Sequence, residues 1–142
     1  MRQIAALLIY TADGQLLFYL RDNKPEIPYP HHWDLFGGHV EAGESVEEAL
    51  EREIWEELRW KVPAYHFFRQ YETSHEPGGP SRKFVFFAEL DQLPESMQLY
   101  EGERLQFFEP AEALNLRFSH IIRDIVADFL TWGSCPEPLR RK

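Results

Sequence analysis

Apolar residues along this chain fall mostly into short runs that are bounded by turn-forming residues. Runs of this length, rich in β-branched and aromatic residues, predict β-strands. The first two runs are separated by Ala12-Asp13-Gly14, a turn signal that favours a strand pair. The strands expected from this pattern are Ile4–Tyr10, Gln15–Leu20, Trp33–Phe36, Tyr65–Thr73, Lys83–Leu90 and Leu105–Phe108.

Two segments show helical spacing instead. In Ser119–Trp132, apolar residues recur every three or four positions, which predicts a helix that packs on the core. In residues 45–58, Ser45 is followed three residues later by Glu48, and this S-x-x-E capping box sets the helix start at Ser45. Residues 22–32 hold three prolines and predict a loop.

Mixed strands with two separated helices predict an α/β or α+β sandwich. Neither a repeat nor a linker divides the chain, so we expect one domain that ends near residue 132. Residues 133–142 contain two prolines and a basic end, and we expect them to form a loose tail.

Composition narrows the class of protein. The 142 residues are 44% hydrophobic and 15% aromatic, enough for a folded core. The formal net charge of −9 argues against binding long nucleic acid through a broad basic surface. It leaves open a small phosphorylated ligand, because a metal ion reverses the local sign of charge.

Cysteine content and the N-terminus indicate the compartment. The single cysteine, Cys135, excludes an internal disulfide framework and suits a reducing environment. The apolar stretch Ile4–Tyr10 is too short for a membrane span and lacks a signal-peptide cleavage pattern. We therefore expect a cytoplasmic protein with no membrane partner.

The predicted helix at 45–58 is crowded with glutamates. At about 100° per residue, Glu56 and Glu57 lie within about 60° of Glu53 on opposite sides, so the three share one face. Arg52, four residues before Glu56, is placed to pair with it.

Two interpretations of this acidic face are open. It is either a solvated surface or a site for a divalent cation. A solubilising face usually mixes signs, whereas only Arg52 accompanies these carboxylates. Gly37-Gly38 precedes the helix, and glycine lets a backbone carbonyl approach an ion closely. Carboxylate and carbonyl oxygens suit Mg²⁺ or Mn²⁺.

The spacing also resembles a known motif. Gly38, five residues, Glu44, seven residues, and then Arg52-Glu53-Ile54-Trp55-Glu56-Glu57 resembles the Nudix box, G-x5-E-x7-R-E-U-x-E-E-x-G-U, where U is aliphatic or aromatic. The resemblance implies a Nudix-type α/β/α sandwich with a mixed β-sheet over residues 1–132. It also implies hydrolysis of a diphosphate bond in a nucleoside diphosphate joined to a group X.

The resemblance assigns roles to individual residues. It implies that Mg²⁺, with Mn²⁺ as a substitute, is bound by Glu53, Glu56, Glu57 and the carbonyl of Gly37. Arg52 orients the carboxylates, and Gly38 and Glu44 support the site from outside it. Because the helix carboxylates are committed to metal, we expect the water-activating base in the loop before Leu105–Phe108, at Glu101 or Glu103.

The sequence departs from the motif at two places. Arg59 replaces the final glycine, so we expect the helix to run on slightly and end before Val62-Pro63. Phe36 stands where many family members have proline, and it is either core or part of the ligand pocket.

Substrate contacts are less specific. Arg21 could contact a phosphate, and Trp33, Tyr29 or Tyr71 could stack on a base, although each also suits a surface or core position. We expect a small nucleotide substrate, a nucleoside triphosphate first. The alternatives are a nucleotide sugar, an RNA 5′ end, or a non-catalytic nucleotide-sensing domain; a homodimer is left open.

Overall fold

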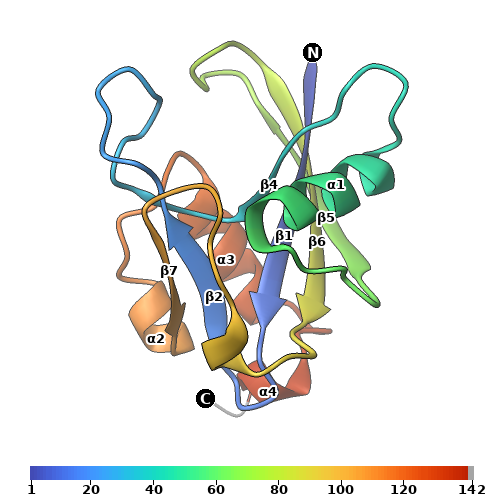
Figure 1. Cartoon of the computed structure of the whole chain (residues 1–142), viewed down its shortest axis with the longest axis vertical. Helices are drawn as coiled ribbons and strands as arrows, with labels where there is room; N and C mark the ends of the chain where they lie inside the picture. Colours follow the sequence, from blue (N-terminus) through green and yellow to red (C-terminus); the bar gives the residue numbers. More distant parts are fainter. Residues whose placement is uncertain (141–142) are drawn as a thin grey trace.

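The computed structural model describes residues 1–140, which form a mixed β-sheet between helical layers (Figure 1). The sheet has seven strands in the order β3-β2-β1-β6-β5, with β4 also paired to β1 and β7 to β2. The strands are β1 (Arg2–Tyr10), β2 (Leu16–Leu20), β3 (Trp33–Asp34), β4 (Phe36–His39), β5 (His66–Thr73), β6 (Ser81–Glu89) and β7 (Arg104–Phe108). The predicted α/β/α sandwich with a mixed sheet is confirmed.

Strand β1 is the centre of the sheet. It runs parallel to β6 from Arg2↔Ser81 to Tyr10↔Glu89 and antiparallel to β2 and β4. Both faces of β1 are covered, because alternate side chains of a strand point to opposite faces. Its sequence therefore reads as a continuous apolar run, as is usual for a strand buried on both sides.

Two hydrophobic cores lie on the two faces of the sheet. Helix α1 (Val46–Leu58) covers one face, where Leu50 and Ile54 are fully buried. Helix α3 (Ile122–Thr131) covers the other, where Ile125 and Phe129 are fully buried (Figure 1). Both helices present an apolar stripe to the sheet, so the sheet is buried from both sides.

The start of α1 is as predicted, but its end is not. Ser45 is the N-cap, its side chain accepts from the Glu48 amide, and the Glu48 carboxylate accepts from the Ser45 amide. The expected run-on beyond Leu58 is wrong. Arg59 itself adopts the left-handed conformation, with φ 52° and ψ 35°, and its amide donates to the carbonyl of Trp55 at 2.8 Å. A non-glycine residue there costs about 1–2 kcal/mol.

The second predicted helix begins later than expected. Trp33 bridges Phe118, and the Ser119 amide donates to the Trp33 carbonyl at 3.0 Å. These contacts hold the chain beside β3, so α3 begins only at Ile122. Four short elements were not predicted: β4, because the expected strand Trp33–Phe36 is divided into β3 and β4, the 3₁₀ turn η1 (Pro94–Ser96), and the helices α2 (Pro110–Ala113) and α4 (Glu137–Arg140).

The expectation of a loose tail is wrong for residues 133–140. The Cys135 thiol and the Leu139 side chain are buried in the core on the α3 side, and Leu139 lies in α4. Residues 141–142 lie outside the described part of the chain.

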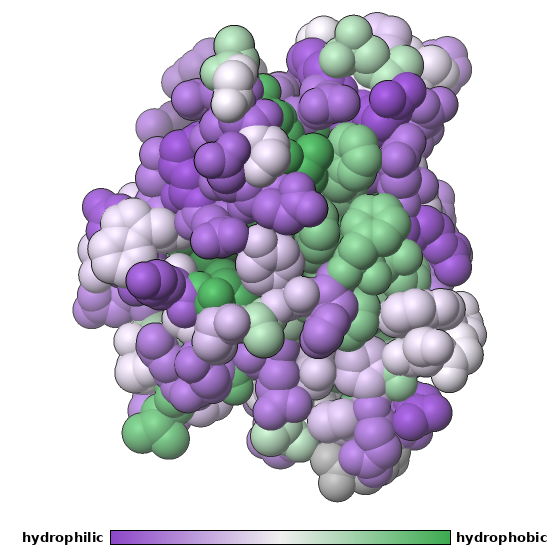
Figure 2. Space-filling view, turned by 90° about the vertical axis from the view of Figure 1, so that its right-hand side faces the viewer, coloured by the Kyte–Doolittle hydropathy of each residue, from purple (hydrophilic) through white to green (hydrophobic). Residues whose placement is uncertain are grey.

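The surface is mostly hydrophilic on the side that Figure 2 shows, with an apolar area near its middle. Among residues 1–140, no helix combines the length and the apolarity needed to cross a bilayer.

The buried tail gives the first testable prediction. Leu139→Ala removes a side chain that is only 4% exposed, so it should lower the free energy of unfolding by about 2 kcal/mol or more. Urea denaturation measures this. Leu93→Ala, at a residue that is 68% exposed, is the matched control and should change little. An equal, small effect of both changes would mean that the tail is loose after all.

Candidate active site

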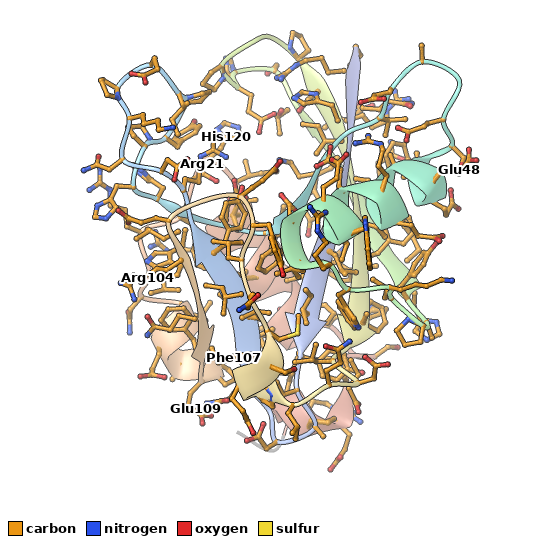
Figure 3. All side chains as sticks on the ribbon, in the orientation of Figure 1. Arg21, Glu48, Arg104, Phe107, Glu109 and His120 are labelled. Carbon is orange, nitrogen blue, oxygen red and sulfur yellow. The ribbon has the colours of Figure 1, made fainter. Side chains whose placement is uncertain are left out.

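Two neighbouring hollows meet at Tyr19 and Arg21, near the end of β2. The larger has a volume of about 250 Å³ and lies between the sheet, the loop after β2 and the segment before α3. The smaller, of about 150 Å³, is lined by Glu57, Glu101 and Gly102 and forms an acidic cleft. In Figure 3, Arg21 and His120 lie on one side of the view, whereas Glu48 lies on the other side, in the first turn of α1.

Three carboxylates converge at the acidic cleft. Glu53 and Glu57 come from α1, and Glu101 comes from the loop before β7. One oxygen from each lies within 4.8 Å of the other two. In the described part of the chain this is the only group of three or more acidic, histidine or cysteine side chains that could hold a metal ion.

The loop that carries Glu101 is fixed by its backbone on both sides. The Tyr100 amide donates to the Glu57 carbonyl at 2.8 Å, and the Glu103 amide donates to the Leu20 carbonyl at 2.9 Å. Between them Gly102 has φ +110°, and a Cβ there would lie 2.9 Å from the Tyr19 ring. The close approach of this loop to β2 therefore requires glycine at position 102.

Burial and mutual repulsion dominate the electrostatics. Burial raises the pKa of Glu57 well above its ordinary value, and the charges of Glu53, Glu101 and Asp34 raise it further. A hydrogen bond from the Gly37 amide, at 2.9 Å to Oε1, acts in the opposite direction. Burial also raises the pKa of Glu53, although Arg52 opposes it. The cleft therefore holds more negative charge than the neighbouring positive groups balance.

Arg52 organises the acidic residues around the cleft. Its Nε and Nη2 donate to the two oxygens of Glu44 at 2.6 and 3.0 Å, and its Nη1 donates to Glu53 at 2.9 Å. The pairing expected with Glu56 is present at 3.2 Å, and Nη2 also donates to the His39 carbonyl at 3.0 Å. Arg52 lowers the pKa of Glu44 to about 2, so Glu44 stays charged and holds the guanidinium in place.

Glycine is required at positions 37 and 38, before the helix, for two different structural reasons. A Cβ on Gly37, which has φ +138°, would lie 2.0 Å from the Ala5 carbonyl oxygen. A Cβ on Gly38 would lie 2.4 Å from the carboxylate carbon of Glu53. Gly38 thus leaves the space in which the Glu53 carboxylate lies.

The structure brings only some of the predicted acidic residues to the cleft. Glu56 is 44% exposed and pairs with Arg52, so it lies outside the group of three. Glu103 pairs with His31 at 3.1 Å, which turns it away from the cleft. Of the two loop acids, only Glu101 faces Glu53.

Only some of the predicted substrate-binding residues lie at the hollows. Arg21 lies between the two hollows and pairs with Asp34 at 3.2 Å. Phe36 is fully buried and packs on Tyr19, with ring centroids 5.2 Å apart, and it also lines the larger hollow, so it belongs both to the core and to the pocket wall. The prediction that Trp33 binds substrate is not supported, because its ring is packed against Phe108 in the core.

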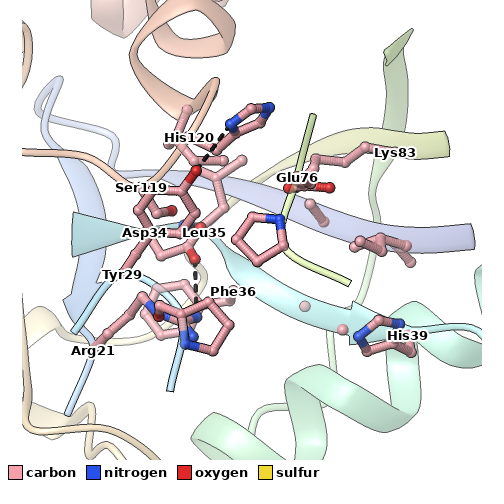
Figure 4. A pocket seen from close by; sticks show the side chains of 18 of the residues that line it. Arg21, Tyr29, Asp34, Leu35, Phe36, His39, Glu76, Lys83, Ser119 and His120 are labelled. Carbon is pink, nitrogen blue, oxygen red and sulfur yellow. Dashed lines mark hydrogen bonds and ion pairs between the residues drawn. The ribbon is translucent and has the colours of Figure 1, made fainter. Parts of the chain in front are cut away.

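The larger hollow has a polar floor that the sequence analysis missed (Figure 4). Lys83 is nearly buried and pairs with Glu76 at 3.3 Å, while Asp34 and Ser119 lie on the adjoining wall. Tyr29, one of the aromatic candidates, lines the hollow; other residues that line it include Lys83, Glu76, Asp34, Ser119 and His120. A charged lysine in the apolar run of β6, and an aspartate inside W-D-L-F, were the available signals.

The acidic cleft has the donors that a hard divalent cation requires. It offers three carboxylates at mutual distances that one ion can bridge, and Arg52 balances only part of their charge. Mg²⁺ and Mn²⁺ prefer such oxygen ligands. Glu53 and Glu57 therefore fit a divalent metal, with the carbonyl of Gly37 as a predicted further ligand, and Glu101 adds a third carboxylate close beside them.

Comparison with known proteins agrees with this geometry. The family model of the NUDIX domain matches residues 1–129. A curated relative, phosphatase NudJ of Escherichia coli K12, is 36% identical over 61 residues, which cover 43% of this chain and 40% of that protein. The chain thus matches less than half the length of this relative.

Solved structures show the same fold. A MutT protein from Methanosarcina mazei Go1 superposes with a TM-score of 0.75 at 22% identity, covering 89% of this chain and 90% of that one. The NUDIX domain of Shewanella oneidensis NrtR, solved with ADP ribose, gives 0.74 at 16% identity, covering 88% and 83%.

The buried Glu57 predicts a pH dependence of stability. Because its folded pKa is raised above the ordinary 4.5, its contribution to stability is present below pH 4.5 and lost as pH rises through the folded pKa. Glu57→Gln mimics the protonated form and can still accept from Gly37. In EDTA at pH 7, the variant should unfold at a higher urea concentration than wild type.

Glu47→Gln is the matched control, because Glu47 is an exposed residue of the same helix. It should not raise the midpoint. A Glu57→Gln variant that is less stable than wild type at pH 7, and equally so at pH 4.5, would contradict the prediction.

Proposed function

Because this chain belongs to the Nudix family, we propose that it is a metal-dependent hydrolase that cleaves a diphosphate bond in a nucleotide. The observation that carries the proposal is the convergence of Glu53, Glu57 and Glu101 within 4.8 Å, directly beside a second hollow. A solvated acidic face would not need a buried Glu57, which is 4% exposed.

Glu53 and Glu57 hold the metal ion in this proposal, with Mg²⁺ as the natural ion and Mn²⁺ as a substitute. When bound, the ion supplies charge neutralisation of phosphate oxygens and activation of water. Arg52 keeps the Glu53 carboxylate oriented toward the cleft, and Gly37 does the same for Glu57 through its amide.

The two hollows support a substrate with two chemically distinct ends. The larger hollow, at about 250 Å³, lies below the roughly 300–1,000 Å³ of sites that enclose whole drug-sized ligands. It therefore takes one end of the substrate, and the aromatic Tyr29 on its wall suits a ring. Arg21, between the hollows, is placed to contact the phosphates. We propose a nucleoside diphosphate linked to X, with a nucleoside triphosphate first.

Glu101 is the proposed general base. It is the exposed member of the three carboxylates, so it keeps contact with solvent water. Glu57, by contrast, is buried, and Glu53 is paired with Arg52. A water molecule therefore reaches Glu101 more easily than the other two carboxylates. Glu101 accepts a proton from the attacking water, and Arg21 and Tyr29 keep the substrate in place.

A panel of nucleotides incubated with Mg²⁺ or Mn²⁺, with released phosphate or pyrophosphate as the readout, tests the activity. Gly38→Ala should reduce turnover of the best substrate roughly 10²-fold, because its Cβ displaces the Glu53 carboxylate. The displaced group is the flexible end of a side chain, so stability should change little.

Gly133→Ala is the control for this change, because its Cβ would meet nothing within 4 Å. It should keep full turnover. If Gly38→Ala also keeps full turnover on the best substrate, Glu53 is not part of the site.

Glu101→Gln separates a base from a metal ligand. It should lower kcat by roughly 10²–10⁴-fold and leave the Mn²⁺ affinity, measured by calorimetry, nearly unchanged. Glu103→Gln, two residues away and paired with His31, is the matched control and should keep most of the activity. A loss of Mn²⁺ binding in Glu101→Gln would assign Glu101 as a ligand instead.

A further inference from the structure

Arg59 occupies a strained position at the end of α1. Its backbone is left-handed, with φ 52°, although glycine adopts this conformation without strain. This left-handed conformation ends the helix, and the Arg59 amide donates to the Trp55 carbonyl whatever side chain is present. A strained non-glycine residue that the helix end does not require indicates that its side chain has another role.

The Arg59 side chain reaches the loop of Glu101. Its guanidinium lies over the Tyr100 ring at 4.9 Å and over the Trp55 ring at 5.8 Å, while Nη1 donates to the Trp55 carbonyl at 3.1 Å. The cation therefore lies between a ring on the helix and a ring on the loop. Both contacts fall within the range of cation–π attraction.

The Tyr100 ring has little else to fix it. It is 50% exposed, and its hydroxyl donates to Gln98 within the same loop. The Tyr100 backbone is tied to α1, because its amide donates to the Glu57 carbonyl at 2.8 Å. Arg59 thus reinforces, through the ring, the same attachment that this hydrogen bond makes through the backbone.

We propose that Arg59 is a positioning residue: by holding Tyr100 against the end of α1, it keeps Glu101 facing Glu53 and Glu57. The role of Glu101 in turnover rests on the proposed function, whereas the attachment of the loop does not. Any loosening of Tyr100 moves the neighbouring Glu101, because the two are consecutive in the chain.

Hydrogen exchange in the metal-free protein tests the attachment directly. Arg59→Gly should speed exchange of the Tyr100 amide tenfold or more and leave the Ala49 amide, inside α1, unchanged. Its melting temperature should be equal to or above that of wild type, because glycine relieves the left-handed strain. Tyr100→Leu should reproduce the faster exchange, and Tyr100→Phe, which keeps the ring, should not.

The two side chains should act through one contact. The double variant Arg59→Gly, Tyr100→Leu should then show no more exchange at residue 100 than either single variant. Arg69→Ala is the matched control, because it removes a guanidinium stacked on Phe68 at 4.8 Å, on β5. It should leave exchange at residue 100 and turnover unchanged.

Turnover supplies the second readout. In Arg59→Gly, kcat should fall about tenfold with the KM and the Mn²⁺ affinity nearly unchanged, and Tyr100→Phe should keep wild-type kcat. Unchanged exchange of the Tyr100 amide in Arg59→Gly would overturn the proposal, whether or not the protein hydrolyses a nucleotide. Faster exchange with unchanged kcat in an active enzyme would also overturn it, since the attachment would not position Glu101. If wild type hydrolyses nothing, the proposed function fails, and the exchange of the Tyr100 amide alone decides for or against Arg59.

Discussion

The pairing of the Arg52 guanidinium with the surrounding glutamates is the interaction on which the acidic cleft depends. Carboxylates that share one helix face repel each other, and a helix of this composition would be poorly stable on its own. Arg52 bonds Glu44 with two nitrogens, contacts Glu53 and Glu56, and reaches the His39 carbonyl on β4. One side chain therefore joins α1, the loop before it and the sheet. The partial neutralisation matters, because it keeps Glu53 in place and leaves negative charge available for a cation.

The sheet provides the fixed frame for these side chains. Strand β1 pairs with β4 through Ala5↔Gly38 and Ala6↔Gly37, so the two glycines of β4 lie directly beside the central strand. Their missing side chains bring the backbone of β4 under α1, where the Gly37 amide meets Glu57. The site thus combines a strand of the sheet, a capped helix and one loop.

Local patterns predicted most of the elements and the helix residues of the site, whereas long-range contacts determine the features that were missed. The capping box fixed the start of α1, and helical spacing brought Glu53 and Glu57 together, because both signals act within a few residues. The contact of Arg59 with Tyr100 and the burial of Leu139 depend on partners that are distant in the sequence. For the same reason, spacing on the helix grouped Glu56 with the other acids, whereas the folded chain brings Glu101 to them. Lys83 could have been noticed as a charge in an apolar strand, but its position beside Asp34 follows only from the fold.

The parallel pairing of β1 with β6 has a consequence for how the chain folds. The strand nearest the N-terminus takes one of its neighbours from beyond the middle of the sequence, with Arg2 opposite Ser81. Such non-local pairing slows folding, because the entropy of closing a long loop is lost before the contact forms. During synthesis, β1 leaves the ribosome first and keeps one edge unpaired until β6 has emerged. An unpaired apolar strand edge favours aggregation, so this domain is exposed to aggregation for longer during folding than its small size implies.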